Sequence, residues 1–384
     1  IKKRFIICFT PALRFFQIRT PADGFHLLFL PNVRITEVGR MDLGGDGLVG
    51  QSSVDGQPES SSTSGFVCQL DATKSMMSTV AGIHNGKKDH HACVKVLEES
   101  ITFETYDTGK NMQGQATLLS NNFSHFDLYI SNNKGFVGND VGGEMNPSND
   151  DEGGGEPSLE FKVNVANFLN CLSIFGAAQS NSTSVRMDYD DRRRTFRLVL
   201  QHGEGALTEC SMSTLDYDEE NTNFFLTFRE SNTVGEVIVL SDSLREAFSE
   251  IYNLPGAASV YLSLSPSAPY FQISAVGNAG RCDIEFPYGS ESFSSFNCEV
   301  PKRSKYQLSL LQHALRALGD SHQTYVRMNE KGMLCLQHKL HHGQNGMSFV
   351  EFVVLPEESE EDENSALPSK EGGLFDSSDS ENEL

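Results

Sequence analysis

Clustered carboxylates are the first side chains in this sequence whose type and spacing suit chemistry. Asp188, Asp190 and Asp191 stand within four residues of one another. A nuclease that works with two metal ions needs several carboxylates converging on ions about 4 Å apart. The other acids concentrate in segments expected to be loops or tails, so no strand or helix position supplies the missing ligands. The pattern allows a metal ion in one loop but gives little support to a two-metal site.

Histidines form two groups that invite a metal assignment, and neither is joined to Cys or carboxylate at a known ligand spacing. The sequence therefore predicts no metal and no cofactor. It contains no GxxxxGK[ST] phosphate loop, and its eight cysteines, without a CxxC, are expected to be reduced thiols. The two histidine groups are His84, His90 and His91, in a Lys-rich turn, and His338, His341 and His342, between strands.

The net charge of −22 over 384 residues conceals an uneven distribution. Residues 357–384 hold eleven Asp and Glu against one Lys, a net −10, and are expected to form a disordered acidic tail. Residues 1–40 hold seven Lys and Arg against two acids, and the first Met is Met41. We therefore expect residues 1–65 to be a disordered N-terminal extension that does not belong to the folded domains. We also expect native synthesis to start at Met41. No segment has the length of a membrane span.

The elements that position the remaining polar residues occur twice. The segment 163–176 (VNVANFLNCLSIFG) has apolar residues at spacings of three and four, which predicts an amphipathic helix. A second helix is predicted at 305–318, and Val-Arg-Met follows each helix, with both pairs offset by 141 residues. Helices predicted at 71–83 and 242–251 are offset by 171. The insertion 131–157, of 27 residues, accounts for the change in offset, so the chain is predicted to be a duplication.

Alternating apolar positions predict the strands of each copy. In the second copy, Val260, Leu262 and Leu264 alternate, a turn follows, and Phe271 and Ile273 alternate again, which predicts a hairpin. A sheet-rich α+β fold with two helices in each copy is the expected result.

Three longer segments resemble a known family: FKVNVANFLNCLSIFG, SDSLREAFSEI and SAPYFQISAVGNAG. They are similar to the Rad-one subunit of the nine-one-one DNA-damage checkpoint clamp, a relative of proliferating cell nuclear antigen. The resemblance covers about residues 66–356, weakens in 131–157 and does not reach either end. It implies the DNA-clamp fold, with two similar domains of antiparallel sheet outside and two helices each inside, forming part of a pseudo-sixfold ring.

The resemblance also divides the chain and assigns its surfaces. Clamp domain 1 would span 66–214, the connector 215–233, clamp domain 2 234–356 and the tail 357–384. Phe224 and Phe225 in the connector are candidate residues for a site where partner proteins dock. Two edge strands are expected to pair with neighbouring subunits, because unpaired edges expose backbone donors and acceptors. Their residues are Thr195, Phe196, Leu198 and Leu200 in one strand and Arg281, Asp283, Ile284 and Phe286 in the other.

Lysines and arginines are the candidates for facing DNA, since phosphate neutralisation supplies most non-specific affinity. They are sparse, so we expect partner subunits to supply much of the positive lining and the contacts to be to phosphates. The DNA-facing candidates are Lys74, Lys87, Lys88, Arg245, Lys302, Arg303, Lys305 and Arg316.

The sequence is therefore expected to encode a non-catalytic, nuclear subunit of a heterotrimeric checkpoint clamp. Its expected partners are two other clamp subunits, double-stranded DNA in the ring lumen, an ATP-dependent clamp loader, and checkpoint and repair proteins. Two alternatives stay open: a 3′ to 5′ DNA exonuclease, as members of such a family have been labelled, and a monomeric protein-interaction scaffold.

Overall fold

The computed structural model describes residues 64–130, 158–203, 205–217, 223–278, 280–342 and 346–357. It also describes the backbone of three N-terminal strands, β1 (Phe16–Arg19), β2 (Phe25–Leu28) and β3 (Val33–Glu37). The sequence predicted no strands in this N-terminal part. The predicted insertion 131–157 and the tail after residue 357 lie outside the described residues.

The first copy contains nine strands and two α-helices, with short 3₁₀ turns at Ser120–Asn122 and Ala177–Gln179. Its elements are β4 (Gly65–Leu70), α1 (Thr73–Ile83), β5 (His91–Leu97), β6 (Ser100–Tyr106), β7 (Met112–Leu119), β8 (His125–Tyr129), β9 (Leu159–Asn164), α2 (Val165–Leu172), β10 (Thr183–Asp190), β11 (Thr195–His202) and β12 (Ala206–Ser213).

The second copy repeats this order after a short connecting helix, α3 (Phe224–Arg229). Its elements are β13 (Thr233–Leu240), α4 (Ser241–Tyr252), β14 (Ser259–Leu264), β15 (Phe271–Gly277), β16 (Gly280–Phe286), β17 (Phe293–Cys298), β18 (Lys302–Gln307), α5 (Leu308–Ala314) with the 3₁₀ turn η3 (Leu315–Gly319), β19 (Ser321–Asn329), β20 (Leu334–His342) and β21 (Gly346–Val354). Strand β13 thus corresponds to β4, and β21 to β12. The predicted duplication is confirmed, as is the hairpin β14–β15.

The sheets have the same internal order in both copies, and all pairings between strands are antiparallel. A five-strand group runs β8-β4-β10-β11-β12 in the first copy and β17-β13-β19-β20-β21 in the second. A four-strand group runs β7-β6-β5-β9 in the first copy and β16-β15-β14-β18 in the second. Strand β21 pairs with β7 from Ser348↔Leu118 to Val354↔Met112, so one nine-stranded sheet joins the two copies.

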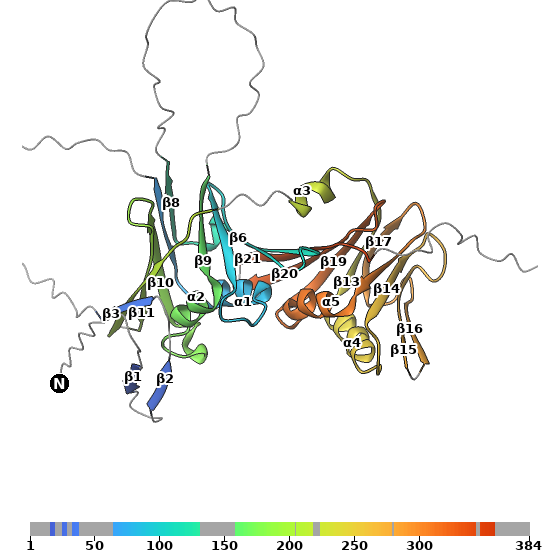
Figure 1. Ribbon diagram of the computed structural model, residues 1–384, viewed down its shortest axis with the longest axis horizontal. Helices are drawn as coiled ribbons and strands as arrows, with labels where there is room; N and C mark the ends of the chain where they lie inside the picture. Colours follow the sequence, from blue (N-terminus) through green and yellow to red (C-terminus); the bar gives the residue numbers. More distant parts are fainter. Residues whose placement is uncertain are drawn as a thin grey trace, which may run out of the picture.

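Helices α1, α2, α4 and α5 lie along one side of the molecule, whereas α3 lies on the opposite side (Figure 1). Apolar residues on their inner faces, such as Met76 and Val80 of α1 and Leu311 of α5, are fully buried. Helix α1 also reaches the second copy, because Gly82 lets it approach closely. A Cβ at Gly82 would lie 3.0 Å from Val350 of β21 and 3.3 Å from Ala317 of η3.

Aromatic side chains fill the core of the first copy. The rings of Phe161 and Tyr189 stack with centroids 4.0 Å apart, and Phe66, Phe168 and Phe196 pack around them. Buried apolar residues of both copies form one continuous cluster. The hydrophobic core is therefore continuous across the two copies.

Two local predictions are wrong. The helix expected from residue 305 begins at Leu308, and Lys305 lies in β18, where polar residues alternate with the buried Ser304 and Tyr306. The helix expected over 163–176 ends at Leu172, so Phe175 lies beyond it.

Candidate nucleic-acid and subunit interfaces

The exposed side of α1 and the turn after it carry three of the predicted DNA-facing lysines, between the exposed Asp71 and Asp89. Lys74, Lys87 and Lys88 are all exposed, as a phosphate-contacting lysine must be. The corresponding helix of the second copy, α4, exposes Asp242, Glu246 and Glu250 around Arg245.

Arg245 donates to Asp242 at 2.6 Å, so its charge is already partly compensated. The predicted DNA-facing residues are therefore unequal: the helical side of the first copy has three exposed lysines where α4 has three exposed acids around Arg245.

Arg316 sits at the junction of the copies and caps α1. Its Nη1 donates to the carbonyl of His84 at 2.9 Å, and Nε2 of His313 donates to the carbonyl of Ile83 at 3.2 Å. Positive charge at a helix C-terminus is favourable. Burial is the main cause that lowers the pKa of His84, His313 and His90, the last to about 4. Arg316 is exposed and remains available to DNA, although it also has this structural role.

Two of the three basic residues of β18, Arg303 and Lys305, lie on the side of the strand opposite Lys302, Ser304 and Tyr306. Ser304 and Tyr306 of β18 point into the core, so Arg303 and Lys305, at alternate positions, point to the opposite, solvent-facing side of the sheet. The guanidinium of Arg303 lies 4.3 Å from the ring centroid of Tyr261, and Lys305 Nζ lies 3.0 Å from Glu357 Oε2. The prediction that Lys305 lines a helix face is thus wrong.

Strand β11 is not an edge strand, contrary to the prediction. It pairs with β10 on one side and with β12 on the other, which leaves no free backbone groups for a neighbour. Phe196, Leu198 and Leu200 are buried in the core, and only Thr195 of the predicted set is partly exposed. The strand beyond it is β12, which pairs with β3. The internal repeat makes β12 the better candidate for pairing with a neighbouring subunit, because its counterpart in the second copy, β21, pairs with β7 of the first copy.

Strand β16 does end its sheet, as predicted for 281–286. Arg281 and Asp283 form an ion pair at 2.7 Å on its exposed side, and Ile284 is half-buried. Phe286 is buried and stacks on Phe271 with centroids 4.8 Å apart. The backbone of β16 is open to a partner strand, and subunit contact by these residues stays a prediction.

Phe224 and Phe225 are buried, so they cannot receive a partner in this conformation. With Phe228 they pack against Met333, Cys335 and Val353 in a small cluster separate from the main core. The Oε1 atom of Gln113 accepts from the backbone amide of Phe224 at 2.7 Å. Three aromatics at positions 224, 225 and 228 share one face of a single helical turn, which explains why α3 attaches here. The three phenylalanines of the connector are thus an internal anchor, whereas Leu226 of the same helix is exposed.

Comparison with known proteins agrees with this architecture. The sequence model described as "Repair protein Rad1/Rec1/Rad17" matches residues 47–340. The chain belongs to this family. It is 34% identical to the mouse "Cell cycle checkpoint protein RAD1" over 205 residues, which cover 53% of this chain and 71% of the mouse protein. The human protein of the same name is 33% identical over the same shares. "DNA repair exonuclease REC1" of Mycosarcoma maydis is 25% identical over 192 residues, 42% of this chain and 40% of that protein.

The acidic cluster of this Rad1-family chain is tied to arginines. Arg197 donates to both carboxylate oxygens of Asp188 at 2.9 Å, and Asp190 lies 3.6 Å from Arg193. No group of three or more His, Cys, Asp or Glu that could hold a metal ion occurs within the described ranges.

The second histidine group has structural partners. His338 is fully buried, its Nε2 donates to the carbonyl of Ala314 at 2.9 Å, and its Nδ1 accepts from the Thr324 hydroxyl at 3.0 Å. Burial lowers the pKa of His338 to about 4, so the ring is neutral at pH 7. His342 bonds Ser348 at 2.6 Å, and both rings thus join elements of the second copy to their neighbours.

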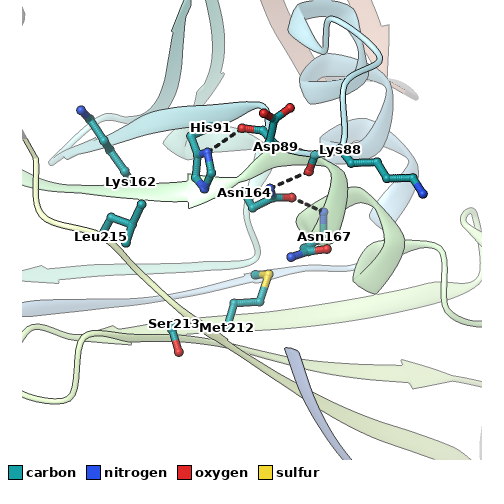
Figure 2. Close-up of a pocket in the computed structure, with 9 residues that line it drawn as sticks. All are labelled: Lys88, Asp89, His91, Lys162, Asn164, Asn167, Met212, Ser213 and Leu215. Atoms are coloured by element: carbon teal, nitrogen blue, oxygen red, sulfur yellow. Dashed lines mark hydrogen bonds between the residues drawn. The ribbon is translucent and has the colours of Figure 1, made fainter. Parts of the chain in front are cut away.

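A cavity of about 390 Å³ lies where the turn after α1, the start of α2 and the end of β12 meet (Figure 2). Its polar groups hold these elements together: Asn164 Nδ2 donates to the carbonyl of Lys88 at 2.8 Å, and Asn164 Oδ1 accepts from the Asn167 amide at 2.8 Å. The side chains of Lys88 and Lys162 point away from each other, so their charges do not converge on one ligand. The residues that line the cavity are Lys88, Asp89, His91, Lys162, Asn164, Asn167, Met212, Ser213 and Leu215.

The cysteines and helices add two findings. The seven cysteines in the described residues are free thiols, and Cys8 lies outside them. None of the described helices is both long and apolar enough to cross a bilayer.

Proposed function

We propose that this chain is a non-catalytic subunit of a heterotrimeric DNA-damage checkpoint clamp that encircles double-stranded DNA in the nucleus. Membership of the Rad1/Rec1/Rad17 family and the checkpoint names of its relatives support the checkpoint role. The observation that supports assembly into a ring is the pairing of β21 with β7, which joins the two copies.

The strand pairing at this joint occurs once within the chain, and the chain contains a second pair of corresponding strands that could pair in the same way between subunits. Strand β21, which ends the five-strand group of the second copy, pairs with β7, which ends the four-strand group of the first copy. The counterpart of β21 in the first copy is β12, and the counterpart of β7 in the second copy is β16. If β12 of one subunit pairs with the strand equivalent to β16 in the next, five strands and four strands again make a sheet of nine, as they do within the chain.

Such a contact is head-to-tail, because two different surfaces meet. Repetition of a head-to-tail contact closes into a ring when the rotation at each joint permits it. Two similar copies in each of three subunits would give the pseudo-sixfold ring that the resemblance implies. The helical faces would line the lumen, where Lys74, Lys87 and Lys88 meet phosphates without reading bases.

Strand β3 lies along β12 in this structure, with Val33 opposite Met212 and Glu37 opposite Thr208. Pairing of β12 with a neighbour requires this edge to be open. The experiment therefore uses residues 41–384, which lack β3, co-expressed with the two partner subunits, and measures the mass of the complex by light scattering. A 1:1:1 heterotrimer is expected, and a monomer that ignores both partners would overturn the proposal and favour an interaction scaffold.

An exonuclease is kept as a second candidate because one relative carries that name. A metal-dependent nuclease assay on the purified chain tests it. Degradation that is lost in a D188N/D190N variant would favour the enzyme, whereas unchanged degradation in that variant would identify a contaminant.

A further inference from the structure

The chain that follows the last strand of each copy runs to the edge strand of that copy's four-strand group, β9 in the first copy and β18 in the second. The two copies differ in the charge that this edge strand exposes. In the first copy the chain leaves β12 and meets the edge of β9 at Lys162. Lys162 and Leu215 exchange two backbone hydrogen bonds of 3.0 Å as an antiparallel pair. The next residue, Asp216, accepts from Arg194 Nη1 at 2.8 Å, which fixes the start of the connector.

The second copy begins the same crossing at the corresponding position. Lys162 and Lys305 each stand three residues before the first residue of a helix, α2 or α5. The amide of Glu357 donates to the carbonyl of Lys305 at 2.7 Å, and its carboxylate accepts from Lys305 Nζ at 3.0 Å and from Ser259 Oγ at 2.8 Å. Glu357 is thus tied to the edge of β18 by backbone and side chain.

The edge beyond this point is basic and open. Strand β18 ends its sheet, and because the carbonyl of Lys305 points outward, the backbone groups of Arg303 point outward as well. Arg303 is exposed, and its guanidinium contacts the Tyr261 ring without an ion-pair partner among the described residues. Its counterpart in β9 is Glu160, which pairs with Lys95 at 3.0 Å, so the positive charge is particular to β18.

The chain that leaves Glu357 has the opposite charge. Residues 358–363 read ESEEDE, and the corresponding stretch after Leu215 reads DYDEE. We propose that the acidic segment after Glu357 is an intramolecular ligand of β18, added as an antiparallel edge strand that covers Arg303. Continuation of the Glu357–Lys305 pair places Ser359 opposite Arg303 and Glu360 opposite Lys302, with Glu361 diagonal to Arg303 and within reach of it.

This cover would protect a basic sheet edge from pairing with other extended chains, as natural edges generally require. The proposal concerns one chain and does not depend on ring assembly, so it can fail while the clamp assignment stands.

Amide hydrogen exchange of the full chain, measured by NMR at low salt, tests the proposal. The comparison variants are a chain that ends at Glu357 and a full-length chain with E358Q, E360Q, E361Q, D362N and E363Q. The amide of Arg303 is expected to exchange about tenfold more slowly in the native chain than in either variant, because an added strand protects it. The amide of Lys162, bonded to Leu215, is the internal control and should not change.

Equal exchange at Arg303 in the native and truncated chains would overturn the proposal. Protection in the truncated chain that rises with protein concentration would mean that a second copy covers the edge, and would overturn it too. High salt should speed exchange at Arg303 in the native chain toward the rate of the neutralised variant, since charge pairing is screened. Because the neutralised variant keeps the full length, the test remains decisive if the truncated chain does not fold.

Discussion

The two copies of this chain share their strand order and sheet pairing, and differ in the charge that they expose. The first copy presents Lys74, Lys87 and Lys88 beside α1, whereas α4 of the second copy presents three acids around Arg245. The buried faces of both helices are mostly apolar. A duplicated fold can therefore keep its core pattern while its surfaces specialise, and the first copy is the better candidate for contact with DNA.

The largest effect is expected from the shared core. Phe161→Ala in the first copy and Phe271→Ala in the second each remove a fully buried ring, at a cost of about 3–5 kcal/mol in the free energy of unfolding. Because β7 and β21 join the copies in one sheet, we expect a single thermal transition, and either change should lower its midpoint temperature. Two separate transitions in calorimetry would show that the copies unfold independently and would break the account of one continuous body.

Charge reversal on the helical face should affect DNA binding differently in the two copies. K87E/K88E in the first copy should weaken retention of the assembled clamp on DNA about tenfold or more and reduce the salt dependence of binding. The matched control is R245E in the second copy, which should have a much smaller effect because Arg245 already pairs with Asp242. Equal losses in binding isotherms at several salt concentrations would contradict the asymmetry.

Acid should destabilise the chain through its buried histidines. His338 and His90 have pKa values lowered to about 4, mainly by burial, while an unfolded histidine titrates near 6.5. Between these values the unfolded chain binds the proton and the folded chain does not, so stability is lost as pH falls from about 6.5 to 4. The expected loss is at most about 1.4 kcal/mol per pH unit for each histidine.

Denaturant titrations at pH 7 and pH 5 measure this loss. His338→Gln should be less stable at pH 7 and show a shallower pH dependence. An unchanged slope in that variant would mean that His338 is not among the groups responsible.

The smallest effect is expected at Lys305. Its side chain is about one-third exposed, and its pair with Glu357 resembles the partly exposed ion pairs that contribute under about 1 kcal/mol. Lys305→Met should therefore change the unfolding free energy little, and should leave DNA retention unchanged because the residue lies on the side away from the helices. A loss of retention comparable to that of K87E/K88E would return Lys305 to the DNA-facing set.

Much of the fold was predictable, because the repeat offsets and the apolar periodicity are local signals. The start of α5 was not, since the spacing of Leu308, Leu311 and Leu315 predicts a helix without showing that Lys305 and Arg303 alternate in the preceding strand. The predicted edge strand, β11, lies inside its sheet, because strand order depends on partners that no single strand reveals. Phe224 and Phe225 look exposed in an acidic connector, and only the tertiary structure shows the small apolar cluster that buries them.

Encirclement of DNA by the proposed ring can be tested through the topology of the DNA. The complex containing residues 41–384 would be loaded onto closed circular DNA by the clamp loader with ATP, washed at high salt, and measured for retention before and after the circle is cut once. Retention on the circle and release after cutting are expected, since a ring slides off a free end. Equal retention on circular and cut DNA would contradict encirclement and indicate ordinary surface binding.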